Sequence, residues 1–89
     1  MAPLMAAEPT SDSTLAEFVE YVARMLARSP DDVKVTEAID GDTVVYKLHL
    51  APDDVGRVIG REGRVIRAIR SLLRAAAVRQ GLRVGLEIE

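Results

Sequence analysis

Two glycines, Gly60 and Gly63, enclose Arg61 and Glu62 directly before an arginine-rich stretch. A residue without a side chain lets a phosphate backbone approach the main chain closely. Unpaired N–H groups at a helix start attract anions, and Arg61 and Arg64 add positive charge at the same place. The segment therefore indicates a contact point for a phosphodiester backbone. A plainer interpretation also fits, because glycines often end one helix and allow a sharp turn into the next.

Charge is unevenly distributed along the 89 residues, although the net charge is only -2. Residues 1–50 sum to -5, from 4 basic and 9 acidic residues, and residues 51–89 sum to +3, from 8 and 5. Within 56–80, Glu62 is the only acid among the arginines Arg57, Arg61, Arg64, Arg67, Arg70, Arg74 and Arg79. A polyanion responds to the local field, so the stripe favours a nucleic-acid partner. A solvated helix face would also carry such a run, and Arg74 and Arg79 fit that interpretation better.

Few other residues have the types and spacing that chemistry requires. The absence of cysteine excludes disulfides and thiolate sites. His49 is the single histidine, and Asp53 and Asp54 are interpreted as a helix start rather than a metal pair. No catalytic triad, phosphate loop with a lysine or zinc spacing is present. We therefore expect no enzyme activity, metal or cofactor. No apolar stretch approaches the roughly 20 residues of a membrane span, which favours a cytoplasmic protein.

Apolar periodicity predicts the elements that position the glycine segment. Thr14 and Glu17 have the capping-box pattern of a helix start. Asp40-Gly41-Asp42 is typical of a hairpin turn, and Gly81 of a helix end. The predicted elements are a helix at 14–27, strands at 33–39 and 43–50, helices at 53–59 and 64–80, and a strand at 82–88. Residues 14–89 thus form one small domain, and residues 1–13 are expected to be a disordered tail.

Aliphatic side chains must build the core, since aromatic residues make up 3% of the chain. Those expected inside are Leu15, Phe18, Val19, Val22, Met25 and Leu26 of the first helix, Val33, Val35 and Ile39 of the first strand, Tyr46 of the second, and Val65, Ile66, Ile69, Leu72, Leu73 and Ala76 of the long helix.

Residues 58–66, VIGREGRVI, resemble the signature V-I-G-x-x-G-x-x-I of the KH domain. The helix and strand placed first make the element order similar to the type II, bacterial arrangement. The single small domain, and the stretch from Pro52 through Arg70, resemble the stand-alone bacterial KhpA family. The resemblance implies an α+β fold with a three-stranded sheet and helices packed on one face. It also implies binding of single-stranded RNA, since KH loops clamp the backbone of about four nucleotides.

The resemblance assigns the clamp loop to Gly60, Arg61, Glu62 and Gly63. Glu62 departs from the basic or neutral residues that many KH loops carry there, and Arg61 or another nearby arginine is expected to pair with it. Aspartate at both Gly60 and Gly63 is expected to abolish RNA binding without unfolding the domain.

The resemblance also assigns the groove beside the loop. Val58 and Ile59 would form an apolar floor for bases. Gly56 and Arg57 lie on the short helix that would form one wall. Further contacts are expected from Arg64 and Arg67, facing phosphates, and from Val45, Lys47 and His49 on strand 43–50 as the other wall.

Three functions stay open from the sequence. The first is an RNA-binding module, for which the resemblance implies a homodimer or a heterodimer with a KhpB-type RNA-binding protein. It also implies a post-transcriptional role, as a regulator or RNA chaperone, linked to cell elongation or division. The second is a helix-turn-helix DNA binder, although its recognition helix would have to expose the apolar residues of 65–73. The third is a KH-fold protein-interaction module with little RNA affinity.

Overall fold

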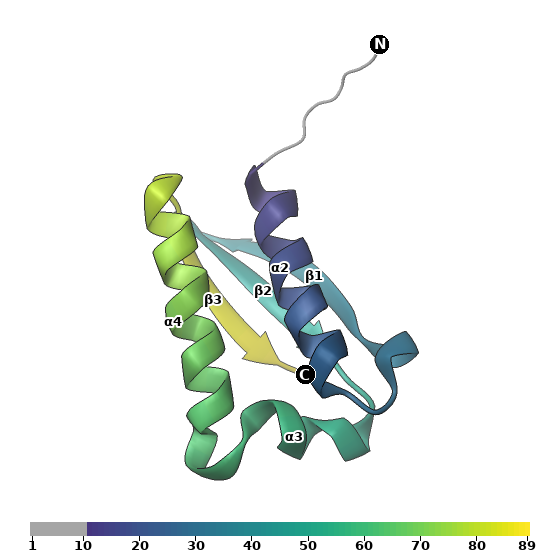
Figure 1. Ribbon diagram of the computed structural model, residues 1–89. Helices are drawn as coiled ribbons and strands as arrows, with labels where there is room; N and C mark the ends of the chain where they lie inside the picture. The colour runs from purple at the N-terminus through teal and green to yellow at the C-terminus, as the bar shows by residue number, and fades with distance from the viewer. Residues whose placement is uncertain (1–10) are drawn as a thin grey trace.

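A computed structural model describes residues 11–89 (Figure 1). Residues 1–10, which make up most of the predicted tail, lie outside the described residues. Single 3-10 turns join several of the regular elements. In chain order the elements are α2 (Ser11–Leu26), η1 (Pro30–Asp32), β1 (Lys34–Asp40), β2 (Thr43–His49), η2 (Pro52–Asp54), α3 (Val55–Ile59), η3 (Arg61–Gly63), α4 (Arg64–Arg79) and β3 (Arg83–Ile88).

The sheet has the order β1-β2-β3, with β2 in the centre. β1 and β2 form an antiparallel hairpin whose turn holds Gly41 at a φ of 65°. β3 pairs parallel to β2, from Thr43 opposite Arg83 to Leu48 opposite Ile88. A parallel pair needs a long crossover, which α3 and α4 supply. The helices lie on one face of the sheet, with α3 near one end of it (Figure 1). The predicted element order, hairpin and one-sided helical layer are confirmed.

The core lies between that helical layer and the sheet. Alternation along β2 turns Val44, Tyr46 and Leu48 toward the helices, and all three are buried. Burial of such apolar side chains is the main source of stability in a domain of this size. The other buried apolar residues are Leu15, Val19, Ala23, Val33, Val58, Ile66, Ile69, Leu73, Ala77 and Leu86.

Three residues expected in the core are exposed instead. Met25 is 69% exposed because it follows Ala23, on the buried stripe of α2, by two residues, or about 200° of helix rotation. Leu72 is 59% exposed, since the buried row of α4 runs through Ile69 and Leu73 beside it. Ile39 is 71% exposed at the hairpin end of β1, an edge strand.

The predicted start of the first helix is also wrong. Thr14 lies inside α2, which begins at Ser11, so it is not the cap of a capping box. Ser11, Asp12 and Ser13 are all of cap-forming types, so residue type alone does not single out one start.

Candidate nucleic-acid interface

The two-glycine segment is a tight left-handed turn between α3 and α4. Gly60 ends α3 with φ 77° and ψ 173°, and its N–H donates to the Gly56 carbonyl at 2.9 Å. The Gly63 N–H then donates back to the Gly60 carbonyl at 3.1 Å. Glu62 (φ 57°) and Gly63 (φ 76°) both have positive φ. The turn therefore changes the direction of the chain within one 3-10 segment, and α4 starts at Arg64.

The two glycines are required for different reasons. A Cβ on Gly60 would lie within the side chain of Val65 and 2.9 Å from the Val65 backbone nitrogen. A Cβ on Gly63 would find its nearest atom, Ile66 Cγ2, at 3.9 Å. Gly60 is thus needed to pack the loop against α4, whereas Gly63 leaves open space. The expectation that aspartate at both positions leaves the fold intact is therefore wrong at Gly60.

Two main-chain amides of the loop remain for a ligand. The N–H groups of Gly60, Gly63 and Arg64 already donate to carbonyls of the same segment. Those of Arg61 and Glu62 have no acceptor among residues 11–89. Consecutive amides in such a turn form a concavity that binds anions. Two main-chain amides of the loop are thus available to an anion, rather than the amides of all four residues 60–63.

Exposed arginine side chains surround these amides. Arg61, Arg64 and Arg67 are all exposed. Glu62 lies 3.7 Å from Arg64, between Oε1 and Nη2, and both side chains are more than 70% exposed. Such a solvated pair is weak, so it leaves the arginines available to phosphates. The structure therefore pairs Glu62 with Arg64, a nearby arginine, and not with Arg61.

α3 forms one side of the interface. Gly56 is exposed and has no atom within 4 Å of a Cβ built on it. Arg57 is exposed and lies 3.8 Å from Asp54, between Nε and Oδ1. Ile59 is half-buried and can contact a base, but Val58 is 0% exposed. The prediction that Val58 forms part of the base-binding floor is wrong, because its side chain faces the core.

Asp54 fixes α3 to the rest of the domain. Its side chain is 1% exposed, and its two oxygens accept the backbone N–H groups of Arg28 at 2.9 Å and Ser29 at 3.0 Å. These hydrogen bonds, from Arg28 first and then Ser29, hold the pKa of the Asp54 carboxyl below its ordinary value, with Arg57 adding to the effect against the opposing effect of burial. The sequence identified Asp54 as a helix start but gave no signal of this tether.

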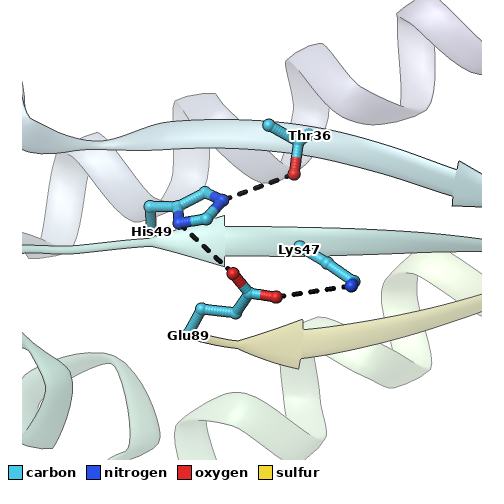
Figure 2. A network of polar contacts seen from close by, with 4 residues as sticks. All are labelled: Thr36, Lys47, His49 and Glu89. Atoms are coloured by element: carbon cyan, nitrogen blue, oxygen red, sulfur yellow. Dashed lines mark hydrogen bonds and ion pairs between the residues drawn. The ribbon is translucent and has the colours of Figure 1, made fainter.

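Lys47 and His49 lie away from the loop. Both point from the face of the sheet that carries no helix, where Glu89 lies 3.5 Å from Lys47 Nζ and 3.6 Å from His49 Nδ1 (Figure 2). His49 Nε2 lies 3.3 Å from the Thr36 hydroxyl. The structure therefore does not bring these two side chains together with the clamp loop, and it gives the lone histidine a carboxylate neighbour that the sequence did not reveal.

The strand beside α4 is β3, and sequence reasoning missed it. Arg70 of α4 donates from Nε and Nη2 to the Leu86 carbonyl at 3.2 and 3.1 Å. A groove of about 340 Å³ runs between the two elements. Val45 also lines it, although its position in the alternation of β2 puts it on the same face of the sheet as Lys47 and His49. The alternation of apolar residues in 82–88 predicted the strand, but it did not predict that this strand lies beside α4.

Comparison with known proteins decides the family. The profile described as the KH domain of KhpA/KhpB matches residues 16–88. The chain belongs to the KhpA/KhpB KH-domain family. The match covers every element from α2 to β3, including the loop.

Curated relatives agree along most of the chain. A protein of Clostridium perfringens named RNA-binding protein KhpA is 38% identical over 83% of this chain and 99% of its own length. The protein of the same name from Chlamydia pneumoniae is 42% identical over 83% and 95%. That of Halalkalibacterium halodurans is 47% identical over 79% and 92%.

Solved structures of Era share the fold. An Aquifex aeolicus Era variant bound to GDP and AlF4 matches with a TM-score of 0.68 at 21% identity, covering 99% of this chain and 35% of Era. Era in complex with MgGDPNP and nucleotides 1506–1542 of 16S ribosomal RNA matches with a TM-score of 0.59 at 21% identity, over 93% and 35%. The chain thus spans about a third of Era, and the likeness supports the type II KH fold.

Among residues 11–89, no cluster of three or more His, Asp or Glu side chains could hold a metal ion. None of the helices described is both long and apolar enough to cross a bilayer.

Proposed function

We propose that this chain binds single-stranded RNA through the 60–63 turn, with its phosphates held by the Arg61 and Glu62 amides and by nearby arginines. The observation that carries the proposal is the open position at Gly63 beside two amides without acceptors. The relatives named RNA-binding protein KhpA support RNA as the ligand. A helix-turn-helix reading of α4 loses its basis, since Ile66, Ile69 and Leu73 are buried.

Gly63→Asp is the test, because the new side chain has room and aspartate is among the residues that tolerate positive φ best. Its carboxylate would repel a phosphate at the turn. Gly41→Asp is a matched control: Gly41 also has positive φ and open space, but it lies in the β1–β2 hairpin. Fluorescence anisotropy with a labelled eight-nucleotide RNA should show at least a tenfold weaker Kd for Gly63→Asp and an unchanged Kd for Gly41→Asp.

Salt dependence provides a second measurement on the wild-type chain. If about three arginines, Arg61, Arg64 and Arg67, each neutralise one phosphate, log K should fall against log salt with a slope of about -2. Duplex DNA of the same length should bind far more weakly.

Equal RNA affinity of Gly63→Asp and the wild type would reject the loop as the site and favour a protein-interaction module with little RNA affinity.

We also propose that the chain acts with a second RNA-binding subunit. A clamp for about four nucleotides gives modest affinity, and joining two clamps raises it without new contacts. The partner is a second copy or a KhpB-type protein, and the exposed Tyr21, Met25 and Leu72 offer apolar contact area. Light scattering after size exclusion, alone and with a purified KhpB-type protein, should show a stoichiometric complex. A role in the cytoplasm, as a post-transcriptional regulator or RNA chaperone affecting cell elongation or division, belongs to the same proposal.

A further inference from the structure

The groove between α4 and β3 continues the arginine surface beyond the loop. Its lining comprises Arg70, Leu73 and Arg74 from α4, residues 84–87 from β3, and Val45 from β2. Gly85 contributes no side chain, so the groove reaches Val45 across the strand. Arg67, Arg70 and Arg74 lie within about 60° of one another on the helix. They therefore form one row on α4, in which Arg70 and Arg74 line the groove.

Arg70 is held in a fixed orientation within this row. β3 is an edge strand, and the Leu86 carbonyl accepts both Nε–H and one Nη2–H of Arg70. A guanidinium has five N–H donors in a planar fork. With two committed to Leu86, the parallel N–H pair at the Nη1–Nη2 end has no acceptor among residues 11–89. This pair is pre-arranged to donate to two adjacent acceptors.

Glu87 supplies the opposite hydrogen-bonding character. It is exposed, lines the same groove, and makes no hydrogen bond or ion pair within the described part of the chain. An ionised carboxylate only accepts hydrogen bonds. Leu73 and Val84 add apolar atoms to the lining of the same groove. The groove thus offers a donor pair, an apolar floor and an acceptor.

We propose that this groove selects a guanine base in the bound RNA, with Arg70 and Glu87 as the specificity-determining residues; the proposal rests on the RNA-binding function proposed above. Guanine presents O6 and N7 to an arginine fork, and it has the N2 amine as a donor for Glu87. Adenine would turn its N6 amine toward the Arg70 donors. Glu87 also disfavours a phosphate as the occupant, since two negative charges would meet.

The groove is within reach of a strand held at the loop. α4 rises about 1.5 Å per residue, so Arg70 lies about 10 Å along the axis from Gly63. KH loops hold about four nucleotides. The guanine therefore belongs to the same short footprint as the clamped phosphates.

The first test uses the wild-type protein and base analogues. Anisotropy titrations compare oligouridylate octamers in which each position in turn is guanine, adenine, inosine or 7-deazaguanine. At one position guanine should bind about five- to hundredfold tighter than adenine, the discrimination expected of one bidentate arginine–guanine pair. Inosine, which keeps O6 and N7, should retain most of the gain, and 7-deazaguanine should lose most of it. Equal Kd values for guanine and adenine at every position would overturn the proposal.

The second test uses variants. Arg70→Lys keeps the charge but not the fork, so guanine and adenine octamers should bind alike, and Glu87→Gln should reduce the preference. Arg79→Lys, at the exposed end of α4 and outside the groove, is the charge-matched control for the arginine change. Thermal unfolding of each variant checks that the fold persists.

Three outcomes separate the two proposals. A uniform loss across all octamers in Arg70→Lys means a phosphate contact and refutes base selection. Sensitivity to Gly63→Asp without base preference refutes only the groove. No binding to any octamer refutes both.

Discussion

Alanine at Gly60 and at Gly63 should have unequal costs, although both glycines have positive φ. Gly60 lies in a region of φ and ψ that is occupied almost only by glycine, at a cost of about 1–3 kcal/mol for another residue. The new Cβ also collides with the Val65 side chain and approaches its backbone nitrogen to 2.9 Å, and overpacking costs about 1–3 kcal/mol. Gly60→Ala should therefore lose about 2–6 kcal/mol of the free energy of unfolding.

Gly63→Ala should lose only about 1–2 kcal/mol, the cost of a left-handed conformation, because its Cβ meets no atom closer than 3.9 Å. In a domain of this size, 1 kcal/mol corresponds to a Tm change of about 4–8 °C. Urea denaturation followed by far-UV circular dichroism measures both variants. The total stability of such a domain is about 4–13 kcal/mol, so Gly60→Ala remains measurable or unfolds outright, and either result fits.

A double-mutant cycle isolates the collision. Val65→Ala removes Cγ2, the nearest atom to a Cβ on Gly60, and leaves the Val65 Cβ and N in place. It therefore relieves part of the collision, and the double variant should be more stable than the sum of the two single changes predicts. Equal losses for Gly60→Ala and Gly63→Ala, with additive behaviour in the cycle, would refute the packing argument. The two glycines would then be required for backbone conformation alone.

Three other changes test the interface and its support. Asp54→Asn should destabilise the domain near pH 7. Because the pKa of Asp54 is lowered in the folded state, the stabilisation by its carboxylate is complete above about pH 4 and is lost as the pH falls through the folded-state pKa. Urea titrations from pH 7 to pH 2 should show the variant and wild-type curves converging at the acid end, and a constant gap would contradict the tether. Gly56→Ala should stabilise the domain by up to about 1 kcal/mol, since the site is helical and uncrowded, and it should weaken RNA binding if the strand lies against α3; unchanged affinity would remove Gly56 from the groove wall. Glu62→Gln should tighten RNA binding about twofold, because it removes roughly 0.5 kcal/mol of repulsion between the Glu62 carboxylate and a phosphate about 8 Å away in water. Kd values measured by anisotropy should show this gain fading in high salt.

Periodicity alone predicted most of the fold. The turn at Gly41, the helix end at Gly81 and the alternation of 82–88 depend on local sequence, and the structure confirms each. Burial was predicted less well where it depends on which neighbour covers a side chain. Leu72 and Ile39 have apolar spacing, but the edge of the sheet and the flank of α4 leave them uncovered.

The candidate site was predicted only in its local part. The loop and the exposed arginines beside it follow from residues 57–67, which are contiguous. The Asp54 tether joins residues 25 and more positions apart, and the Arg70 bond to Leu86 crosses 16 positions. Neither pairing leaves a pattern in one sequence. The assignment of Lys47 and His49 to a groove wall placed the wrong strand beside α4, because strand order was not known.

The parallel pairing of β3 with β2 has a consequence for synthesis. The hairpin and the turn at 60–63 emerge from the ribosome before Arg83–Ile88, yet Arg70 has no Leu86 carbonyl to hold it until that segment arrives and docks. The proposed clamp is therefore complete in sequence before the proposed base groove exists. On that proposal, selective recognition of RNA begins only once β3 has docked.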